Sequence, residues 1–205
     1  MDIALVDYGM GNLRSIQKKL LKLGANVIIT SDPLQIKKSD KIILPGVGHF
    51  KKAVSNLLRL SLWEVLNEEV LVKSKPILGI CLGMQLMAGH SEEGDARGFG
   101  WLDADVKRFE IRDKLHYKIP HIGWNQIKIY KNSKIFSGVQ DNSYFYFVHS
   151  YYMECKNLND VLAVSEYEQE FVSAVEKRNI IGFQFHPEKS HDLGELLLKN
   201  FLKLY

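Results

Sequence analysis

The chain has few cysteines, no long apolar run and no concentrated block of positive charge. Its 205 residues include only two cysteines, Cys81 and Cys155, which excludes a framework of several disulfides. No stretch approaches the roughly 20 apolar residues of a membrane span, and the N-terminus lacks the basic segment of a signal peptide. These absences predict a reducing, cytoplasmic compartment and no membrane partner.

Charge is also modest. The formal net charge is +3, and the lysines are scattered in pairs such as Lys37-Lys38, which are typical of solvated faces. No basic block interleaves with aromatic residues as a nucleic-acid groove requires, so no nucleic-acid partner is expected. The sequence also contains no linker, repeat or low-complexity segment. We therefore expect residues 1–205 to form a single domain.

The first half of the chain alternates short apolar runs with helical patterns. Apolar residues at helical spacing predict helices, and short buried runs predict strands. The expected strands are 3–7, 27–30, 41–44 and 77–80, and the expected helices are 12–23, 50–58, 62–72 and 83–88. Strands that alternate with helices favour a parallel, doubly wound sheet with helices on both faces.

The pattern changes after about residue 91. A loop is expected at 94–100, strands at 106–109, 125–130, 144–149, 161–165, 171–176 and 180–185, and a last helix at 193–204. Trp124 falls in a loop-like Gly-Trp-Asn segment, and Cys155 falls between strands. Successive strands without helices favour antiparallel pairing. The predicted fold is therefore α/β, with a mostly parallel sheet and an antiparallel extension at its edge.

Cys81 lies in the segment Gly79-Ile80-Cys81-Leu82-Gly83, where a buried strand passes through a turn into a helix. This is the cysteine form of the nucleophile elbow, in which small flanking residues let the chain turn sharply and expose the side chain. A helix N-terminus also stabilises a thiolate, the reactive form of cysteine. The alternative is a structural cysteine in a core strand, which a lone cysteine usually is.

A histidine and a glutamate follow another expected strand, in Phe185-His186-Pro187-Glu188. Residues two apart on an extended chain point the same way, so His186 and Glu188 are expected to share a face. Pro187 favours an extended His186, and a carboxylate beside an imidazole orients the ring and stabilises its charged form. Taken alone, a strand-end histidine with an unrelated surface glutamate is the simpler interpretation.

The third segment is the Pro-Gly-Val-Gly turn at 45–48, which follows an expected strand. Glycines let backbone N–H groups turn toward a ligand, and the carboxyl ends of parallel strands gather at one edge of a sheet. This turn and Cys81 should therefore be neighbours. The backbone N–H groups of Val47, Gly48 and Leu82 are then candidates for an oxyanion hole. The simpler interpretation is an ordinary strand-to-helix turn.

Together, the three segments resemble the signatures of the class I, triad-type glutamine amidotransferases, and the likeness extends over 3–201. Within that family, the chain is most similar to the glutaminase subunits of imidazole glycerol phosphate synthases, which act in histidine biosynthesis. Met84, where anthranilate and GMP types usually have histidine, and Lys189-Ser190 are the most discriminating positions. The segments that carry the likeness are 7–13 (DYGMGNL), 79–85 (GICLGMQ), 120–125 (PHIGWN), 147–151 (FVHSY) and 186–190 (HPEKS).

The resemblance implies that Cys81 is the nucleophile of glutamine hydrolysis, that His186 is the general acid and base, and that Glu188 orients His186. It implies no metal and no organic cofactor. The residues that would hold glutamine are Gly46, Gln85, Ser150 and Tyr151. The residues that would contact a TIM-barrel cyclase subunit, in a heterodimer, are Asn12, Trp124, Tyr146 and Lys189. The cyclase would use the ammonia to form imidazole glycerol phosphate and an aminoimidazole carboxamide ribotide.

Two other functions remain open on the sequence. A paralogous glutaminase that feeds ammonia to another synthase, such as one that amidinates a sugar, would have the same triad. Only the identity of its partner would distinguish it. A non-catalytic interaction domain on the same scaffold is the more distant alternative, and three intact motifs argue against it.

Overall fold

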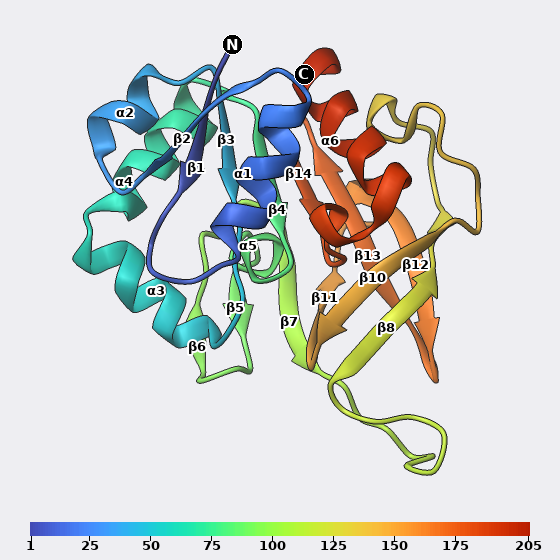
Figure 1. Ribbon diagram of the computed structural model, residues 1–205. Helices are drawn as coiled ribbons and strands as arrows, with labels where there is room; N and C mark the ends of the chain where they lie inside the picture. The colour runs from blue at the N-terminus through green and yellow to red at the C-terminus, as the bar shows by residue number, and fades with distance from the viewer.

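The computed structural model describes residues 1–205 as an α/β fold built on a twelve-stranded sheet (Figure 1). Parallel strands form one half of the sheet, in the order β2-β1-β3-β4-β14. Their bounds are β1 Asp2–Val6, β2 Asn26–Thr30, β3 Lys41–Leu44, β4 Ile77–Ile80 and β14 Ile180–Phe183. The predicted α/β class and its parallel core are confirmed.

Helices cover both faces of the parallel strands because alternate strand residues point to opposite sides. On β1, Ile3 and Leu5 pack in one core with residues of α1 and α6, whereas Ala4 and Val6 pack in a second core with residues of α2, α3 and α4. The bounds of these helices are α1 Leu13–Lys22, α2 Pro33–Lys38, α3 Phe50–Arg59, α4 Leu62–Asn67 and α6 His191–Leu204. The sheet is therefore doubly wound, as predicted.

The other half of the sheet is the predicted antiparallel extension. β13 pairs antiparallel with β14, β11 pairs with β13, and β7 pairs with β11. β12 pairs with β13 and with β9, and β5 and β6 form the far edge. The bounds are β5 His90–Ser91, β6 Ala96–Arg97, β7 Ala104–Arg108, β9 Lys128–Ile129, β11 Tyr151–Cys155, β12 Val161–Tyr167 and β13 Gln169–Lys177.

Two further strands form a separate antiparallel pair, which we call the β8–β10 ribbon. β8 spans His121–Gln126 and β10 spans Tyr144–His149, and Trp124 lies opposite Tyr146. The prediction of a loop-like segment around Trp124 is therefore wrong. Its glycine suggested a turn, but Gly123 (φ +134°) lies within the paired strand.

Other local predictions also need correction. Cys155 is the last residue of β11, a strand that was not predicted, rather than a thiol between strands. The expected helix at 62–72 is α4 followed by the π-helix η1 (Glu68–Val72). α2 was missed, although Asp32, whose carboxylate accepts a hydrogen bond from Leu34 N, and Pro33 mark its start. The short helices are α5 Leu82–Gln85, η2 Lys134–Phe136, η3 Leu158–Asp160 and η4 Pro187–Lys189.

No helix in the structure combines the length and the apolar composition that crossing a membrane requires.

Candidate active site

The carboxyl ends of three adjacent parallel strands bring the three sequence motifs together. β3 leads into the turn at 45–48, β4 leads into Cys81, and β14 leads toward His186. Leu44 is paired with Gly79, and Phe183 with Ile80, so the strands end at nearly the same level. The turn and Cys81 are neighbours, as the topology predicted.

Cys81 occupies a sharp turn between β4 and α5. Its backbone dihedrals are φ 54° and ψ −110°, in a region that L-residues rarely adopt. The backbone N–H of Cys81 donates to the Phe183 carbonyl at 2.7 Å, which anchors the turn to β14. A Cβ atom at Gly83 would lie 1.8 Å from the Leu44 carbonyl oxygen, so only glycine permits this approach of α5 to β3. These features form the predicted nucleophile elbow.

His186 and Glu188 form a buried pair behind Cys81. His186 Nδ1 lies 2.8 Å from Glu188 Oε1, and both side chains are almost fully buried. His186 Nε2 is also buried and makes no regular hydrogen bond, which leaves it free to interact with Cys81. Burial by itself lowers the pKa of His186, but the interactions with Cys81 and Glu188 outweigh it and raise that pKa to about 10. The imidazolium form is therefore favoured at neutral pH.

The backbone around this pair differs from the extended segment that was predicted. β14 ends at Phe183, and His186 is extended, but Pro187–Lys189 forms the 3-10 turn η4. Pro187, with its fixed φ, begins that turn. His186 and Glu188 therefore meet across a tight turn rather than on one face of a strand.

The backbone of β10 contacts both His186 and Cys81. The His186 N–H donates to the Tyr146 carbonyl at 2.8 Å, and Cys81 Sγ lies 3.8 Å from the Val148 carbonyl oxygen. The Tyr146 N–H donates to Ser190 Oγ at 3.0 Å, and Ser190 Oγ donates to the His186 carbonyl at 2.7 Å. The β10 backbone therefore lies against both the Cys81 thiol and the His186 backbone.

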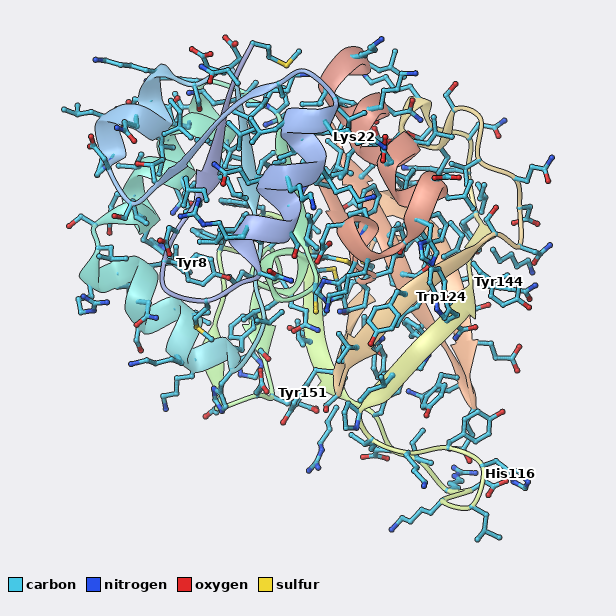
Figure 2. The ribbon with its side chains drawn as sticks, viewed as in Figure 1. Tyr8, Lys22, His116, Trp124, Tyr144 and Tyr151 are labelled. Atoms are coloured by element: carbon cyan, nitrogen blue, oxygen red, sulfur yellow. The ribbon has the colours of Figure 1, made fainter.

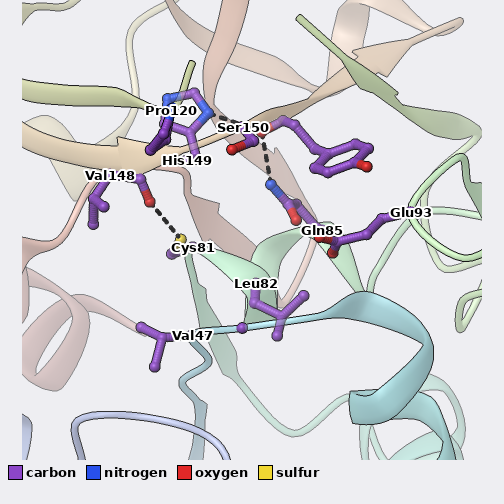
Figure 3. Close-up of a pocket in the computed structure, with 11 residues that line it drawn as sticks. Val47, Cys81, Leu82, Gln85, Glu93, Pro120, Val148, His149 and Ser150 are labelled. Carbon is purple, nitrogen blue, oxygen red and sulfur yellow. Dashed lines mark hydrogen bonds between the residues drawn. The ribbon is translucent and has the colours of Figure 1, made fainter. Parts of the chain in front are cut away.

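A pocket of about 260 Å³ opens in front of Cys81 (Figure 3). Its lining contains predicted oxyanion-hole and substrate residues: Val47, Gly48, Leu82, Gln85, Ser150 and Tyr151. Gly46 is buried and does not line the pocket, nor do His186 and Glu188. No group of three or more His, Cys, Asp or Glu side chains is arranged to hold a metal ion.

The pocket also contains two ionisable side chains to which the sequence analysis gave no role: Glu93, outside the motifs, and His149, within the segment 147–151. Glu93 follows the short strand β5, and its Oε2 accepts a hydrogen bond from Phe50 N at the start of α3 at 2.7 Å. Figure 3 shows this carboxylate near Gln85. The only sequence signal at Glu93 is a pair of glutamates in a loop, which is ordinarily a solvated surface.

The Gln85 amide is held by the protein on its nitrogen side. Gln85 Nε2 donates to the Tyr151 carbonyl at 2.9 Å and to Gln184 Oε1 at 3.0 Å. Both of its N–H groups are therefore used, and Oε1 remains as an acceptor on a residue that lines the pocket. Such an oxygen suits a ligand that carries an amide or ammonium group.

The outward face of the β8–β10 ribbon is apolar and exposed. Ile122, Trp124 and Tyr144 are 59%, 45% and 54% exposed, and the Trp124 and Tyr144 side chains are labelled in Figure 2. Trp124 stacks on His191 at a centroid distance of 4.9 Å, and Lys189 Nζ lies 5.3 Å from the centroid of the Tyr146 ring. Asn12, also exposed, precedes α1. We call the four ribbon side chains Ile122, Trp124, Tyr144 and Tyr146 the docking face.

Comparison with known proteins gives the same family for nearly the whole chain. The family described as glutamine amidotransferase class-I matches residues 4–204. The imidazole glycerol phosphate synthase subunit HisH 2 of Methanococcus maripaludis is 49% identical over 201 residues, which are 98% of either chain. The subunit HisH 2 of Pseudomonas aeruginosa is 46% identical over 202 residues, which are 98% of this chain and 99% of that one.

Solved structures share the fold at lower identity. A glutamine amidotransferase superposes with a TM-score of 0.76 at 17% identity and covers 98% of this chain and 97% of its own. PurLQS from Thermotoga maritima gives a TM-score of 0.73 at 17% identity, with 99% and 98% coverage. At this identity the likeness establishes the architecture alone.

The site predicts a large difference in reactivity between the two cysteines. Burial raises the pKa of Cys155 to about 12, so its thiolate is scarce at neutral pH. Cys81 faces the pocket beside the His186 cation. Iodoacetamide at neutral pH should therefore modify Cys81 at least about a hundredfold faster than Cys155, as measured by peptide mass spectrometry. Glu188→Gln should slow the labelling of Cys81 only, and Cys155 reacting first would contradict this account of the site.

Proposed function

The chain belongs to the class I glutamine amidotransferases, and we propose that it is the glutaminase subunit of an imidazole glycerol phosphate synthase in the cytoplasm. Relatives that bear that subunit name match it over nearly their full length. One observation carries the catalytic part of the proposal. The cysteine of a strained elbow faces a substrate-sized pocket and has a carboxylate-paired histidine behind it.

The reaction is an acyl transfer from nitrogen to sulfur and then to water. The Cys81 thiolate attacks the side-chain amide carbon of glutamine, and the carbon–nitrogen bond breaks as His186 protonates the departing ammonia. A γ-glutamyl thioester remains on Cys81. His186 then removes a proton from water as it attacks the thioester, and glutamate leaves. Glu188 holds the His186 ring and stabilises its cation throughout.

Backbone N–H groups stabilise the negative oxygen of each tetrahedral intermediate. Leu82 is the first residue of α5, and its N–H makes no hydrogen bond within the helix. The turn at 45–48 supplies the second donor, from Val47 or Gly48. Gly48 has a φ of +113°, a conformation that favours glycine and allows its peptide to reorient. One such donor is worth about 10²–10³ in kcat.

Glutamine binds with its amide toward Cys81 and its amino-acid group toward Gln85 and Glu93. The Glu93 carboxylate pairs with the α-ammonium group, and Gln85 Oε1 accepts a hydrogen bond from the ligand. Ser150 and Tyr151 form the opposite wall, and Gly46 supports the turn from behind. The Glu93 carboxylate and Gln85 Oε1 both accept hydrogen bonds, and together they favour a ligand with a cationic α-amino group.

The ammonia passes to a TIM-barrel cyclase subunit that binds the docking face together with Asn12 and Lys189. Exposed aromatic side chains in one patch, with a lysine at its edge, are typical anchors of a protein interface. The cyclase uses the ammonia to form imidazole glycerol phosphate and an aminoimidazole carboxamide ribotide. Direct transfer is required because ammonia in neutral water is mostly ammonium, which is not a nucleophile.

Removal of the nucleophile tests the proposed reaction. Cys81→Ser should abolish glutamine hydrolysis, because a serine hydroxyl is a far weaker nucleophile than a thiolate in this site. The same variant in complex with the cyclase should still form product from ammonium salt at alkaline pH. Glutamate release and cyclase product are measured in parallel. Glutaminase activity that persists in Cys81→Ser would refute the assignment of the nucleophile.

A change at Glu93 tests the orientation of glutamine. Glu93→Gln keeps an oxygen for the Phe50 N–H but removes the charge that pairs with the α-ammonium group. The KM for glutamine should rise about 10–100-fold, which is the worth of a hydrogen bond to a charged group, while kcat changes less. The rate with ammonium salt is the control and should stay the same. An unchanged KM would remove Glu93 from the substrate site.

The last change tests coupling to the partner. Because the β10 backbone contacts both His186 and Cys81, docking on the ribbon should improve the catalytic geometry, and the isolated chain should hydrolyse glutamine slowly. The liganded cyclase should raise the rate by about 10²–10³, the worth of a completed oxyanion hole. Lys189→Ala removes the cation beside Tyr146 and should reduce this activation more than it changes the KM. Lys52→Ala, an exposed lysine on α3, is the matched control.

Two outcomes of that experiment would favour other functions. A free chain that already works at its full rate, with or without a partner, would indicate a stand-alone glutaminase. Activation by a different barrel synthase, and not by the histidine-pathway cyclase, would identify a paralogous glutaminase that serves that synthase.

A further inference from the structure

A chain of hydrogen bonds runs through the inner side of the β8–β10 ribbon to the pocket. His121 Nδ1 lies 3.1 Å from His149 Nε2, and His149 Nδ1 lies 2.8 Å from the Tyr151 carbonyl oxygen. Asn125 Nδ2 lies 3.4 Å from His121 Nε2. His121 and His149 are directly opposite each other on β8 and β10, and both are buried. The reaction described above uses neither ring.

Both ends of this hydrogen-bonded series require the same arrangement of protons on the two histidine rings. The Tyr151 carbonyl only accepts, so His149 carries its proton on Nδ1 and leaves Nε2 as an acceptor. At the other end, Asn125 Nδ2 donates to the Glu166 carbonyl at 2.9 Å, and Asn125 Oδ1 accepts from Gln126 N at 2.8 Å. The second N–H of Asn125 therefore points to His121 Nε2. The His121 proton is then on Nδ1, where it donates to His149.

The arrangement holds only while both rings are neutral, since an added proton would set two N–H donors against each other. Burial lowers the pKa of His121 to about 4. Burial, together with the neighbouring His121, lowers the pKa of His149 to about 3. The His121 ring is also held by stacking, at centroid distances of 4.0 Å from Tyr167 and 5.2 Å from Phe147. One tautomer of each ring is therefore fixed at neutral pH.

The hydrogen-bonded series continues from the Tyr151 carbonyl to Cys81. That carbonyl also accepts a hydrogen bond from Gln85 Nε2, which donates to Gln184 Oε1 as well. Gln184 Nε2 in turn lies 3.6 Å from Cys81 Sγ. The oxygen of Gln184 is taken by Gln85, so its N–H faces the sulfur. Each amide in the series thus has one orientation, and Gln85 Oε1 is left for the ligand.

We propose that His121 and His149 are positioning residues of the glutaminase, which orient the Tyr151 carbonyl and the Gln85 amide for glutamine. The inference rests on the proposed function, and it adds a connection to the partner. Asn125 immediately follows Trp124 of the docking face, so the hydrogen-bonded series links the docking strand to the substrate amide. His121 does not line the pocket. The hydrogen-bonded route from His121 to the glutamine site therefore passes through His149.

The test compares two replacements of His121 in the complex with the cyclase. His121→Phe keeps the aromatic stacking but removes the donor to His149. His121→Asn places an amide nitrogen where Nδ1 stood and restores that donor. His121→Phe should raise the KM for glutamine about tenfold, the worth of one buried hydrogen bond, with a smaller change in kcat. His121→Asn should stay within about threefold of the wild type, because its donor is restored.

Two controls separate positioning from loss of structure. Thermal unfolding of each variant and its co-elution with the cyclase report folding and docking, and both should match the wild type; the rate with ammonium salt reports the cyclase and should also be unchanged. His116→Phe, in the exposed loop between β7 and β8, is the matched histidine control and should behave as the wild type (Figure 2). If the His121→Phe protein does not fold, a second pair of variants at His149 tests the same inference. His149→Leu should raise the KM, and His149→Asn, which keeps the donor to Tyr151, should not.

A wild-type KM in His121→Phe, or equal effects of the Phe and Asn replacements, would overturn the inference. A wild-type complex that releases no glutamate from glutamine would instead overturn the proposed function, and the inference with it.

Discussion

The backbone turn at Cys81 is the constraint on which the rest of the site depends. A non-glycine residue in this conformation costs about 1–3 kcal/mol, and the surrounding structure must supply that energy. The hydrogen bond from Cys81 N to the Phe183 carbonyl contributes to it, and the lack of a Cβ at Gly83 lets α5 lie directly against Leu44. The contacts that hold the strained turn therefore also bring β3 and β14 beside it. The turn at 45–48 and His186 are close to Cys81 for the same reason.

The parts of the fold and site that are local in sequence were predictable. The strands β1, β3, β4 and β14 were recognised from short buried runs, and β10 was predicted with its observed bounds. Cys81, His186 and Glu188 stand in motifs whose residue types and spacing indicate chemistry, and the topology brings them together. Their catalytic roles remain predictions that the experiments above address.

What the sequence could not indicate depends on contacts between distant segments. Glu93 is one glutamate of a loop until α3 and the pocket are placed around it. The pairing of His121 with His149 depends on the register of β8 and β10, and β8 itself was hidden by Gly123. β11 follows β10 after a single residue, so one long polar and aromatic stretch covers two strands in different sheets. Register and sheet membership are set by packing, which no local pattern encodes.

The β8–β10 ribbon connects the proposed docking face to the contacts around Cys81 and His186. The ribbon shares no backbone ladder with the twelve-stranded sheet, and side chains of Asn125 and His149 bond to carbonyls of β12 and β11. Its outward side chains form the docking face, and its backbone carbonyls at Tyr146 and Val148 contact His186 and Cys81. A small shift of one element would change both catalytic contacts together, which is the behaviour expected of a partner-activated enzyme.

The histidines of this site differ in charge because their neighbouring groups differ. The interactions of His186 with Cys81 and Glu188 outweigh its burial and raise its pKa to about 10, whereas burial and the neighbouring His121 lower the pKa of His149 to about 3. The proximity of His186 further lowers the pKa of His149. Positive charge is therefore confined to the ring that, in the proposed reaction, stabilises the thiolate and protonates ammonia. A second cation at His149 would oppose the α-ammonium group of glutamine in the same pocket. A neutral His149 keeps its N–H for the Tyr151 carbonyl, so the proposed mechanism assigns proton transfer and substrate positioning to different histidines.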